Sequence, residues 1–207
     1  VRPPVNTVYG CHIYVDTPSA SQKDPTTFER LTLLVENEKG YYNLLRIVSY
    51  RYEDGDRWAE IPSVPLDTIE QFKEGIIAIA GDFFSRYGQN VASGRDSLAL
   101  EYMDRLNQIF DHDHLYISVC DNGIPQQKRV NEFNVELAKK YGREVVAVGD
   151  VHYIKPEDAT AHKILRCISL KVTLNGFEDK RFPTEKFYFR TEKEMVELFG
   201  HIPGAIE

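Results

Sequence analysis

The sequence contains few cysteines, and they form no paired motif. Cys11, Cys120 and Cys167 are far apart, and no Cys-x-x-Cys occurs in the 207 residues. An odd number of widely spaced cysteines argues against a disulfide framework and against a structural zinc site. We therefore expect three reduced thiols, buried as small apolar side chains in a cytoplasmic protein.

Long apolar runs are also missing. No stretch approaches the roughly 18 apolar residues that a transmembrane helix needs, and no charged segment is followed by an apolar leader. The sequence therefore predicts no membrane contact. The chain begins Val-Arg-Pro-Pro without a Met, and we interpret it as a piece of a longer protein or as a processed product.

Several nucleotide-binding and hydrolase motifs are absent as well. There is no Gly-x-Gly-x-x-Gly, no Walker-type loop and no Gly-x-Ser-x-Gly. Hydride transfer to a dinucleotide, P-loop hydrolysis and serine hydrolysis therefore have no support. Lys and Arg number 25 against 32 Asp and Glu, a net charge of −7. An acidic chain is poorly suited to broad, non-specific binding of phosphate backbones, although this does not exclude a local basic patch.

The sequence does contain a regular alternation of predicted strands and helices. With 42% hydrophobic and 28% charged residues, the composition is that of one globular domain. Short links between strands and helices are typical of βα units around a parallel sheet, and right-handed crossovers allow a barrel or an open sheet. The predicted strands cover residues 9–15, 31–35, 76–80, 115–120 and 145–148, the predicted helices cover 41–50, 66–73, 97–110, 127–141, 156–169 and 192–199, and the predicted loops cover 16–27, 51–65 and 82–94.

The most informative stretch is 145–159, an apolar strand followed by Asp-x-His and then a helix opened by Pro156. Side chains alternate between the two faces of a strand, so Asp150 and His152 are predicted to project together. Such a pair suits a hard or borderline metal, and strand ends are where α/β barrels place their chemistry. The alternative is an Asp that caps a turn and a His packed at a strand end.

Other candidate ligands are less clear. His12 lies in the first predicted strand, and Asp82 follows the apolar strand 76–80, which we expect to be buried on both faces. The run 111–114, Asp-His-Asp-His, resembles a metal site but joins a helix to a strand, so we expect an exposed linker. His162 lies within a predicted helix and is expected to be a core or interface histidine.

Several segments together resemble the polymerase-and-histidinol-phosphatase (PHP) domain of the bacterial replicative DNA polymerase III alpha subunit, in matching order and with similar spacing from Arg2 to Glu207. Each segment matches one motif of that family. They are Gly10-Cys11-His12-Ile13-Tyr14-Val15 for GCE-x-YV, Leu31-Thr32-Leu33-Leu34-Val35 with Gly40-Tyr41-Tyr42-Asn43-Leu44 for HLTLLA and GYxNL, Glu74-Gly75-Ile76-Ile77-Ala78 for EGLIAL, Gly149-Asp150-Val151-His152-Tyr153 with Pro156-Glu157-Asp158-Ala159 and His162 for NDVHYxxPEDAxxH, and Phe187-Tyr188-Phe189-Arg190 with Glu192 and Met195 for FYLKSPEEM.

The resemblance implies a distorted (β/α)7 barrel that is incomplete at its N-terminus, because the family's opening His-x-His strand and a further His strand are not present. Residues 1–180 would form the partial PHP domain, and residues 181–207 would lead to the polymerase palm. The palm aspartates that bind magnesium would lie beyond residue 207. The parent would be a DNA-directed DNA polymerase, a nucleotidyltransferase of DNA replication, and this chain alone is not expected to polymerise DNA.

The resemblance also implies a metal cluster at the barrel mouth, but this sequence departs from it. Asp150 and His152 keep the ligand types, and His12 and Asp82 stand at Glu and Cys positions where they could still hold Zn, Mn or Fe. Three further ligand positions are occupied by residues that mostly cannot bind a metal, and the cation among them repels one. They are Arg30, Ser118 and Asn122. We therefore predict a degenerate metal site.

Two functions remain open at this stage. In the first, the domain has no catalytic residue, supports the polymerase core, can dock the proofreading exonuclease subunit, and meets DNA only through the parent protein. In the second, it is a metal-dependent phosphoesterase or 3'-5' exonuclease, in which a metal-bound hydroxide attacks a phosphodiester. Strand edges left open by the missing units are also expected to promote oligomers.

Overall fold

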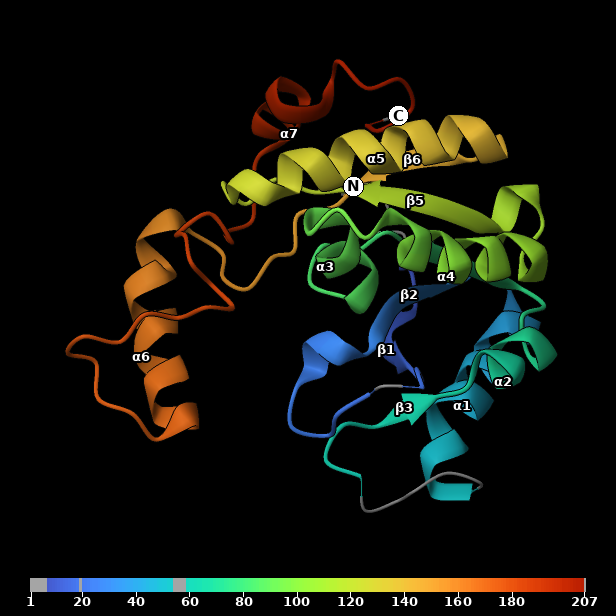
Figure 1. The fold of residues 1–207 in the computed structure, drawn as a ribbon, viewed down its shortest axis with the longest axis horizontal. Helices are drawn as coiled ribbons and strands as arrows, with labels where there is room; N and C mark the ends of the chain where they lie inside the picture. The colour runs from blue at the N-terminus through green and yellow to red at the C-terminus, as the bar shows by residue number, and fades with distance from the viewer. Residues whose placement is uncertain (1–6, 19, 54–58, 207) are drawn as a thin grey trace, which may run out of the picture.

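The structure is a computed structural model that describes residues 7–18, 20–53 and 59–206. This part of the chain forms a six-stranded sheet with seven α-helices (Figure 1). The strands are β1 (Gly10–Val15), β2 (Glu29–Val35), β3 (Ser63–Val64), β4 (Ile76–Ala80), β5 (Leu115–Val119) and β6 (Glu144–Ala147), and the helices are α1 (Glu38–Glu53), α2 (Leu66–Gln71), α3 (Arg86–Ala92), α4 (Asp96–Ile109), α5 (Pro125–Tyr141), α6 (Ala159–Leu170) and α7 (Glu192–Phe199).

The sheet is mixed and open, with the order β3-β1-β2-β4-β5-β6. Only β2 is antiparallel to its neighbours, β1 and β4, whereas the pairs β1–β3, β4–β5 and β5–β6 are parallel. The predicted parallel sheet is therefore only partly formed, because β2 runs against both of its neighbours. The reason lies in the connection between β1 and β2, which contains no crossover helix and so returns the chain in the opposite direction.

The predicted (β/α)7 barrel is not formed by the described strands. In this part of the chain β3 and β6 lie at opposite edges of the sheet and do not pair with each other. Closing a sheet into a barrel requires its two edges to be joined through a continuous ladder of hydrogen bonds. The mixed α/β class is correct, but the sheet remains open.

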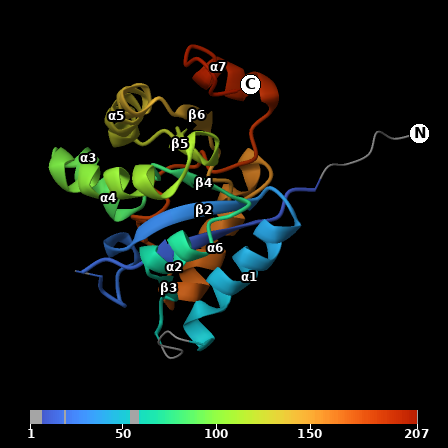
Figure 2. The ribbon, with the colours of Figure 1, turned by 90° about the vertical axis from the view of Figure 1, so that its right-hand side faces the viewer.

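Helices cover the outer face of the curved sheet. In Figure 2, α1 to α5 surround the strands on the outside, and α1, α3 and α5 contact them directly. Alternate strand residues, such as Leu31 and Leu33 of β2, are buried in this layer, as the two-residue period of a strand requires. Ile77 and Ile79 of β4 point to the other face and are only half-buried, so the expectation that β4 is buried on both faces was wrong.

Helix α3 was not predicted from the sequence, which indicated a loop over 82–94. Ser85 caps this helix by accepting a hydrogen bond from the Gly88 N–H, and Tyr87 and Val91 are buried one turn apart. Gly88, within this helix, allows close packing. A Cβ at this position would lie 2.3 Å from the Phe83 carbonyl oxygen, so this glycine serves the approach of two backbone segments.

Other helix ends follow the sequence closely. Helix α5 ends at Gly142, which adopts φ 64°, as expected for a glycine that terminates a helix. Thr191 caps α7 in a reciprocal arrangement with Glu194. Pro156 opens a short 3-10 turn, Pro156–Asp158, before α6 begins. Part of the predicted 51–65 loop lies outside the described residues, and within its described part α1 extends to Glu53 and β3 occupies Ser63–Val64.

The segment that carries α6 leaves the sheet after β6 and later returns to it. We refer to residues 179–190 as the returning segment. It lies beside residues 152–154, because the His152 N–H donates a hydrogen bond to the Phe187 carbonyl oxygen (2.8 Å) and the Phe189 N–H donates one to the Tyr153 carbonyl oxygen (2.9 Å). Helix α6 consequently stands apart from the main body, on the left of Figure 1. No described helix is both long and apolar enough to cross a membrane.

Candidate functional site

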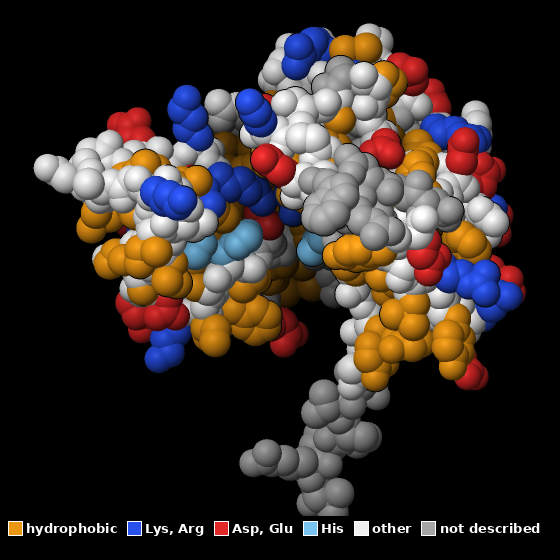
Figure 3. Space-filling model, turned by 90° about the horizontal axis from the view of Figure 1, so that it is seen from below, with side chains coloured by type: hydrophobic (Ala, Val, Ile, Leu, Met, Phe, Trp, Pro, Cys, Tyr) orange, Lys and Arg blue, Asp and Glu red, His pale blue; other side chains and the backbone are white. Residues whose placement is uncertain are grey.

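All four predicted metal ligands line one cavity of about 480 Å³. The cavity lies on the uncovered face of the sheet, where β4, β5 and β6 end, and it brings together His12, Asp82, Asp150 and His152. Figure 3 shows a hollow between the lobe that contains α6 and the rest of the molecule, with histidine side chains exposed on its walls. The four residues that the sequence singled out as metal ligands therefore share one cavity. Its other walls include Arg30, Thr32, Ile79, Phe83, Phe84, Ser118, Cys120 and Gln127.

Asp82 is held by neighbours through both carboxylate oxygens. Gly81, at φ 97°, turns the chain after β4, and Asp82 Oδ1 then accepts a hydrogen bond from the Phe84 N–H at 2.7 Å. Its Oδ2 forms an ion pair with Arg30 Nη1, also at 2.7 Å. The Asp82 carboxylate therefore caps the turn before α3 and neutralises a guanidinium.

Asp150 and His152 lie side by side, as predicted, but not through strand alternation. β6 ends at Ala147, and Asp150 adopts φ 42°, a left-handed conformation that Asp tolerates better than most residues. This turn places His152 Nε2 at 3.3 Å from Asp150 Oδ1. The pair is thus presented by a tight turn beyond the strand.

A second arginine approaches Asp150 from the returning segment. Arg181 Nη2 lies 3.7 Å from Asp150 Oδ2, and its guanidinium carbon lies 3.4 Å from the ring centre of Phe84. Desolvation opposes ionisation of Asp150, but the hydrogen bond with His152 and the charges of Arg181 and Arg30 outweigh it, so the pKa of Asp150 is lowered. Asp150 is therefore a carboxylate near neutral pH.

His12 faces the cavity from β1. Its Nδ1 is hydrogen-bonded to Thr32 Oγ1 at 2.8 Å, across the strand pair in which His12 and Thr32 are directly opposite. Desolvation in the cavity, followed by the nearby positive charge of Arg30, lowers the pKa of His12. The imidazole is therefore neutral at physiological pH.

Asn122 forms the centre of a buried hydrogen-bond network beside the cavity. Its side chain is fully buried and donates to the carbonyl oxygens of Gly149 and Lys186, each at 3.0 Å. Its own oxygen accepts from Gln127 Nε2 at 3.1 Å and from Cys120 Sγ at 2.9 Å. Asn122 thereby joins the end of β5, the turn after β6 and the returning segment, a role that the sequence did not reveal.

Cys120 is an unreactive thiol in this environment. Burial is the main cause that raises the pKa of its thiol far above the usual value, so the reactive thiolate is not populated near neutral pH. The three cysteines are free thiols, and Cys120 and Cys167 are buried. The prediction of unpaired thiols is confirmed, with Cys11 only partly buried.

The donor groups of the cavity do not fit a metal cluster as they are arranged. Within the described residues, no three His, Cys, Asp or Glu side chains converge as a ligand set. Each of the two carboxylates instead faces an arginine, Arg30 beside Asp82 and Arg181 beside Asp150. Arg181 was missed from the sequence because it lies in an irregular segment without periodicity. Metal binding by the four candidate ligands stays a prediction.

The remaining histidine candidates occupy the predicted kinds of environment. Residues His112–His114 form a short 3-10 turn, with His112 and Asp113 exposed and hydrogen-bonded to each other, so this run is a linker. His162 is half-buried, and its ring centre lies 4.6 Å from that of Phe182 and 5.3 Å from that of Tyr153. It is an interface histidine between α6 and the returning segment.

Comparisons with known proteins identify the family of the chain. A family model described as PHP domain matches residues 2–122, which is more than half of the chain. The DNA polymerase III subunit alpha of Thermus aquaticus is 37% identical over 80% of the chain, that of Treponema pallidum is 30% identical over 98%, and that of Pasteurella multocida is 32% identical over 86%. The chain spans 13–17% of the length of these relatives. It belongs to the PHP domain family.

Proposed function

We propose that this chain is the PHP-domain part of a replicative DNA polymerase alpha subunit and that it acts as a structural and interaction domain. The observation that carries this proposal is the ion pair between Arg30 and Asp82 at 2.7 Å. A guanidinium at this distance takes the place of a metal cation beside the carboxylate and repels a second positive charge. The cavity is then a degenerate metal site stabilised by arginines.

The parent protein defines the wider context of the proposal. Relatives named DNA polymerase III subunit alpha match 80–98% of the chain, and this supports a parent that is a cytoplasmic, DNA-directed DNA polymerase. Nucleotide addition and its Mg²⁺ would belong to a palm outside this chain, to which residues 181–207 would connect. Preceding strands of the parent would complete a PHP barrel at the open edges β3 and β6, and the proofreading exonuclease subunit is a candidate partner.

The alternative is a metal-dependent phosphoesterase or 3'-5' exonuclease. It requires a hydroxide-bearing metal among Asp150, His152, His12 and Asp82. The observation in its favour is that these four side chains share one cavity, and the observation against it is that an arginine accompanies each carboxylate. We therefore prefer the structural function.

The test is the metal content of the purified full-length parent, measured by mass spectrometry, together with primer extension. We expect DNA synthesis by the parent and no stoichiometric Zn, Mn or Fe that depends on Asp150. The informative variant is Asp150→Ala, and Asp96→Ala is a matched control because Asp96 pairs with Arg129 on the surface and neither residue lines the cavity. Near-stoichiometric metal that is lost in Asp150→Ala alone would establish the alternative. A parent without polymerase activity would refute the wider proposal.

A further inference from the structure

A second pocket lies on the covered face of the sheet, away from the cavity described above. It has a volume of about 510 Å³ and is lined by residues of the loop after β1, of β2 and of the helices α2, α3 and α4. Figure 2 shows α2 and α4 as neighbours, and Arg105 of α4 joins them by ion pairs with Asp67 and Glu70 of α2 at 3.4 and 2.6 Å. We refer to this cavity as the α2–α4 pocket. Its volume lies within the range of roughly 300–1,000 Å³ that small-ligand sites occupy.

Two polar side chains form the buried part of the α2–α4 pocket. Glu29, the first residue of β2, is 4% exposed, and Tyr102 of α4 is 9% exposed. Glu29 Oε2 accepts a hydrogen bond from the Tyr87 N–H, whereas the Tyr102 hydroxyl is buried without a hydrogen-bond partner in the described part of the chain. Desolvation is the main cause that raises the pKa of this hydroxyl, and the charge of Glu29 adds to it, so the two groups are close. Buried polar groups are normally hydrogen-bonded, and the bottom of the pocket therefore has unused hydrogen-bonding capacity.

The walls and the rim of the pocket differ from its bottom. Leu66 of α2 and Leu98 of α4 give it apolar walls. Asp16, after β1, and Glu101 of α4 also line the pocket and are exposed to solvent, so they lie at its rim. The pocket thus has carboxyl groups at two depths and apolar side chains as well.

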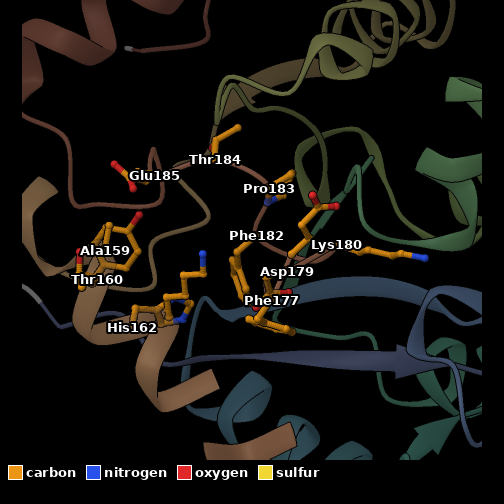
Figure 4. A pocket seen from close by; sticks show the side chains of 13 residues that line it. Ala159, Thr160, His162, Phe177, Asp179, Lys180, Phe182, Pro183, Thr184 and Glu185 are labelled. Carbon is orange, nitrogen blue, oxygen red and sulfur yellow. The ribbon is translucent and has the colours of Figure 1, made fainter. Parts of the chain in front are cut away.

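The charges of the α2–α4 pocket favour a cationic ligand. Apart from Arg105, which is paired with α2, the lining contains Arg86 as a cation and four carboxyl groups. They belong to Asp16, Glu29, Glu101 and Asp104. The pocket between α6 and the returning segment, which Figure 4 shows, is balanced instead, because two lysines and two glutamates line it and Asp179 is already paired with Arg166. The excess of acidic groups therefore distinguishes the α2–α4 pocket from this neighbouring one.

We propose that the α2–α4 pocket binds a short aliphatic diamine, with one ammonium group at Glu29 and Tyr102 and the other at the acidic rim. An ammonium group donates several hydrogen bonds and accepts none, so it matches a carboxylate and the oxygen of a tyrosine hydroxyl. The methylene groups between the two charges would lie against Leu66 and Leu98, where their burial is favourable. The pocket shares no lining residue with the cavity that holds the candidate metal ligands, so this inference is independent of the proposed function.

The protonation of Glu29 couples diamine binding to pH. Burial raises the pKa of its carboxyl group to about 7, whereas a primary amine resembles the lysine side chain and stays charged up to about pH 10. Below pH 7 a proton must therefore leave Glu29 before it can pair with an ammonium group, so the affinity should rise roughly tenfold from pH 6 to pH 8. The charged and titratable groups that lie beside Glu29 or line its pocket are Asp16, Asp82, Arg86, Tyr87, Glu101, Tyr102, Asp104 and Arg105.

The test is the binding of putrescine to the full-length parent, measured by isothermal titration calorimetry in saturating Mg²⁺ and located by hydrogen exchange at residues 98–108. We expect Glu29→Gln to weaken binding at least tenfold at pH 8 and to remove its pH dependence. Tyr102→Phe should weaken binding severalfold without lowering the free energy of unfolding, because the hydroxyl it removes has no partner in the described part of the chain. Glu38→Gln on α1 is the matched control, since Glu38 is exposed and does not line the pocket.

Three further probes separate the possible ligands. Butanediol, an uncharged analogue of the same length, should not bind, and binding equal to that of putrescine would overturn the proposal. Equal affinity for butylamine would overturn it in favour of a single ammonium group, such as a lysine side chain. Protection of residues 98–108 by Mg²⁺ without any amine would overturn it in favour of a divalent cation. The absence of putrescine binding at millimolar concentration, or unchanged binding in Glu29→Gln, would also overturn it.

Discussion

The two faces of the same sheet are stabilised in different ways. On the face covered by helices, β2 contributes Leu31 and Leu33, which are essentially inaccessible to solvent. On the cavity face the same strand contributes Arg30 and Thr32, which are half-buried and make polar contacts with Asp82 and His12. The comparison shows that apolar burial determines one face, whereas specific hydrogen bonds and ion pairs determine the other.

The largest expected effect comes from the covered face. Leu33→Ala removes a fully buried side chain and should lower the free energy of unfolding by about 2–5 kcal/mol, because it loses apolar burial and leaves a cavity. Leu34→Ala, at the neighbouring half-buried position of the same strand, is the matched control and should cost clearly less. Denaturant unfolding followed by circular dichroism measures both. Equal losses would show that the two faces do not differ in this way.

On the cavity face, removing the Asn122 side chain should lower the free energy of unfolding. Asn122→Ala leaves the carbonyl oxygens of Gly149 and Lys186 without their donor, and buried groups without partners cost about 1–3 kcal/mol. The same unfolding experiment, with the exposed Asn175→Ala as control, should show a loss for the first variant only. Hydrogen exchange should also become faster at residues 186–190. An unchanged stability would mean that water replaces the amide without cost.

The sequence predicted the covered face better than the cavity face for a physical reason. Buried strand residues recur with period two, and helices have their own period, so β4, α5 and α7 were found from short windows. Arg181 and Asn122 act across long sequence separations, with partners 27–64 residues away. No local pattern reports such contacts. The direction of β2 and the open edges of the sheet likewise depend on pairing between distant segments.

In the candidate site, too, local sequence patterns indicated individual residues but not their contacts with distant segments. His12, Asp82, Asp150 and His152 could be singled out because each lies on or just after a recognisable strand, and the structure brings all four to one cavity. Their partners were not predictable in the same way. Arg30 was expected only to repel a metal, and the structure adds that it pairs directly with Asp82. The ion pairs, and hence the chemistry of the cavity, come from the tertiary structure.

The last expected effect depends on pH and concerns a carboxyl group buried on the covered face. Glu29 shares that face with Leu31 and Leu33, is buried, and accepts a hydrogen bond from the Tyr87 N–H at 2.8 Å. Burial raises the pKa of its carboxyl group to about 7, although the bond from Tyr87 and the charge of Arg86 oppose this. The covered face therefore holds a proton on Glu29 that the unfolded chain releases at lower pH.

The sign of the pH dependence follows from this difference. Between the ordinary pKa of 4.5 and about 7 the folded protein binds more protons at Glu29 than the unfolded chain, so its contribution to stability falls as pH rises through this window. Glu29→Gln keeps an oxygen that accepts from Tyr87 but does not ionise. The difference in free energy of unfolding between Glu29→Gln and the unsubstituted protein should therefore be about 1–3 kcal/mol more favourable to the variant at pH 8 than at pH 4.5. Thermal unfolding across this range measures the gain, with Glu178→Gln, at an exposed glutamate, as the control. A stability difference between Glu29→Gln and the unsubstituted protein that stays the same at all pH values would contradict this explanation. It would mean that the covered face tolerates a carboxylate as readily as the cavity face does.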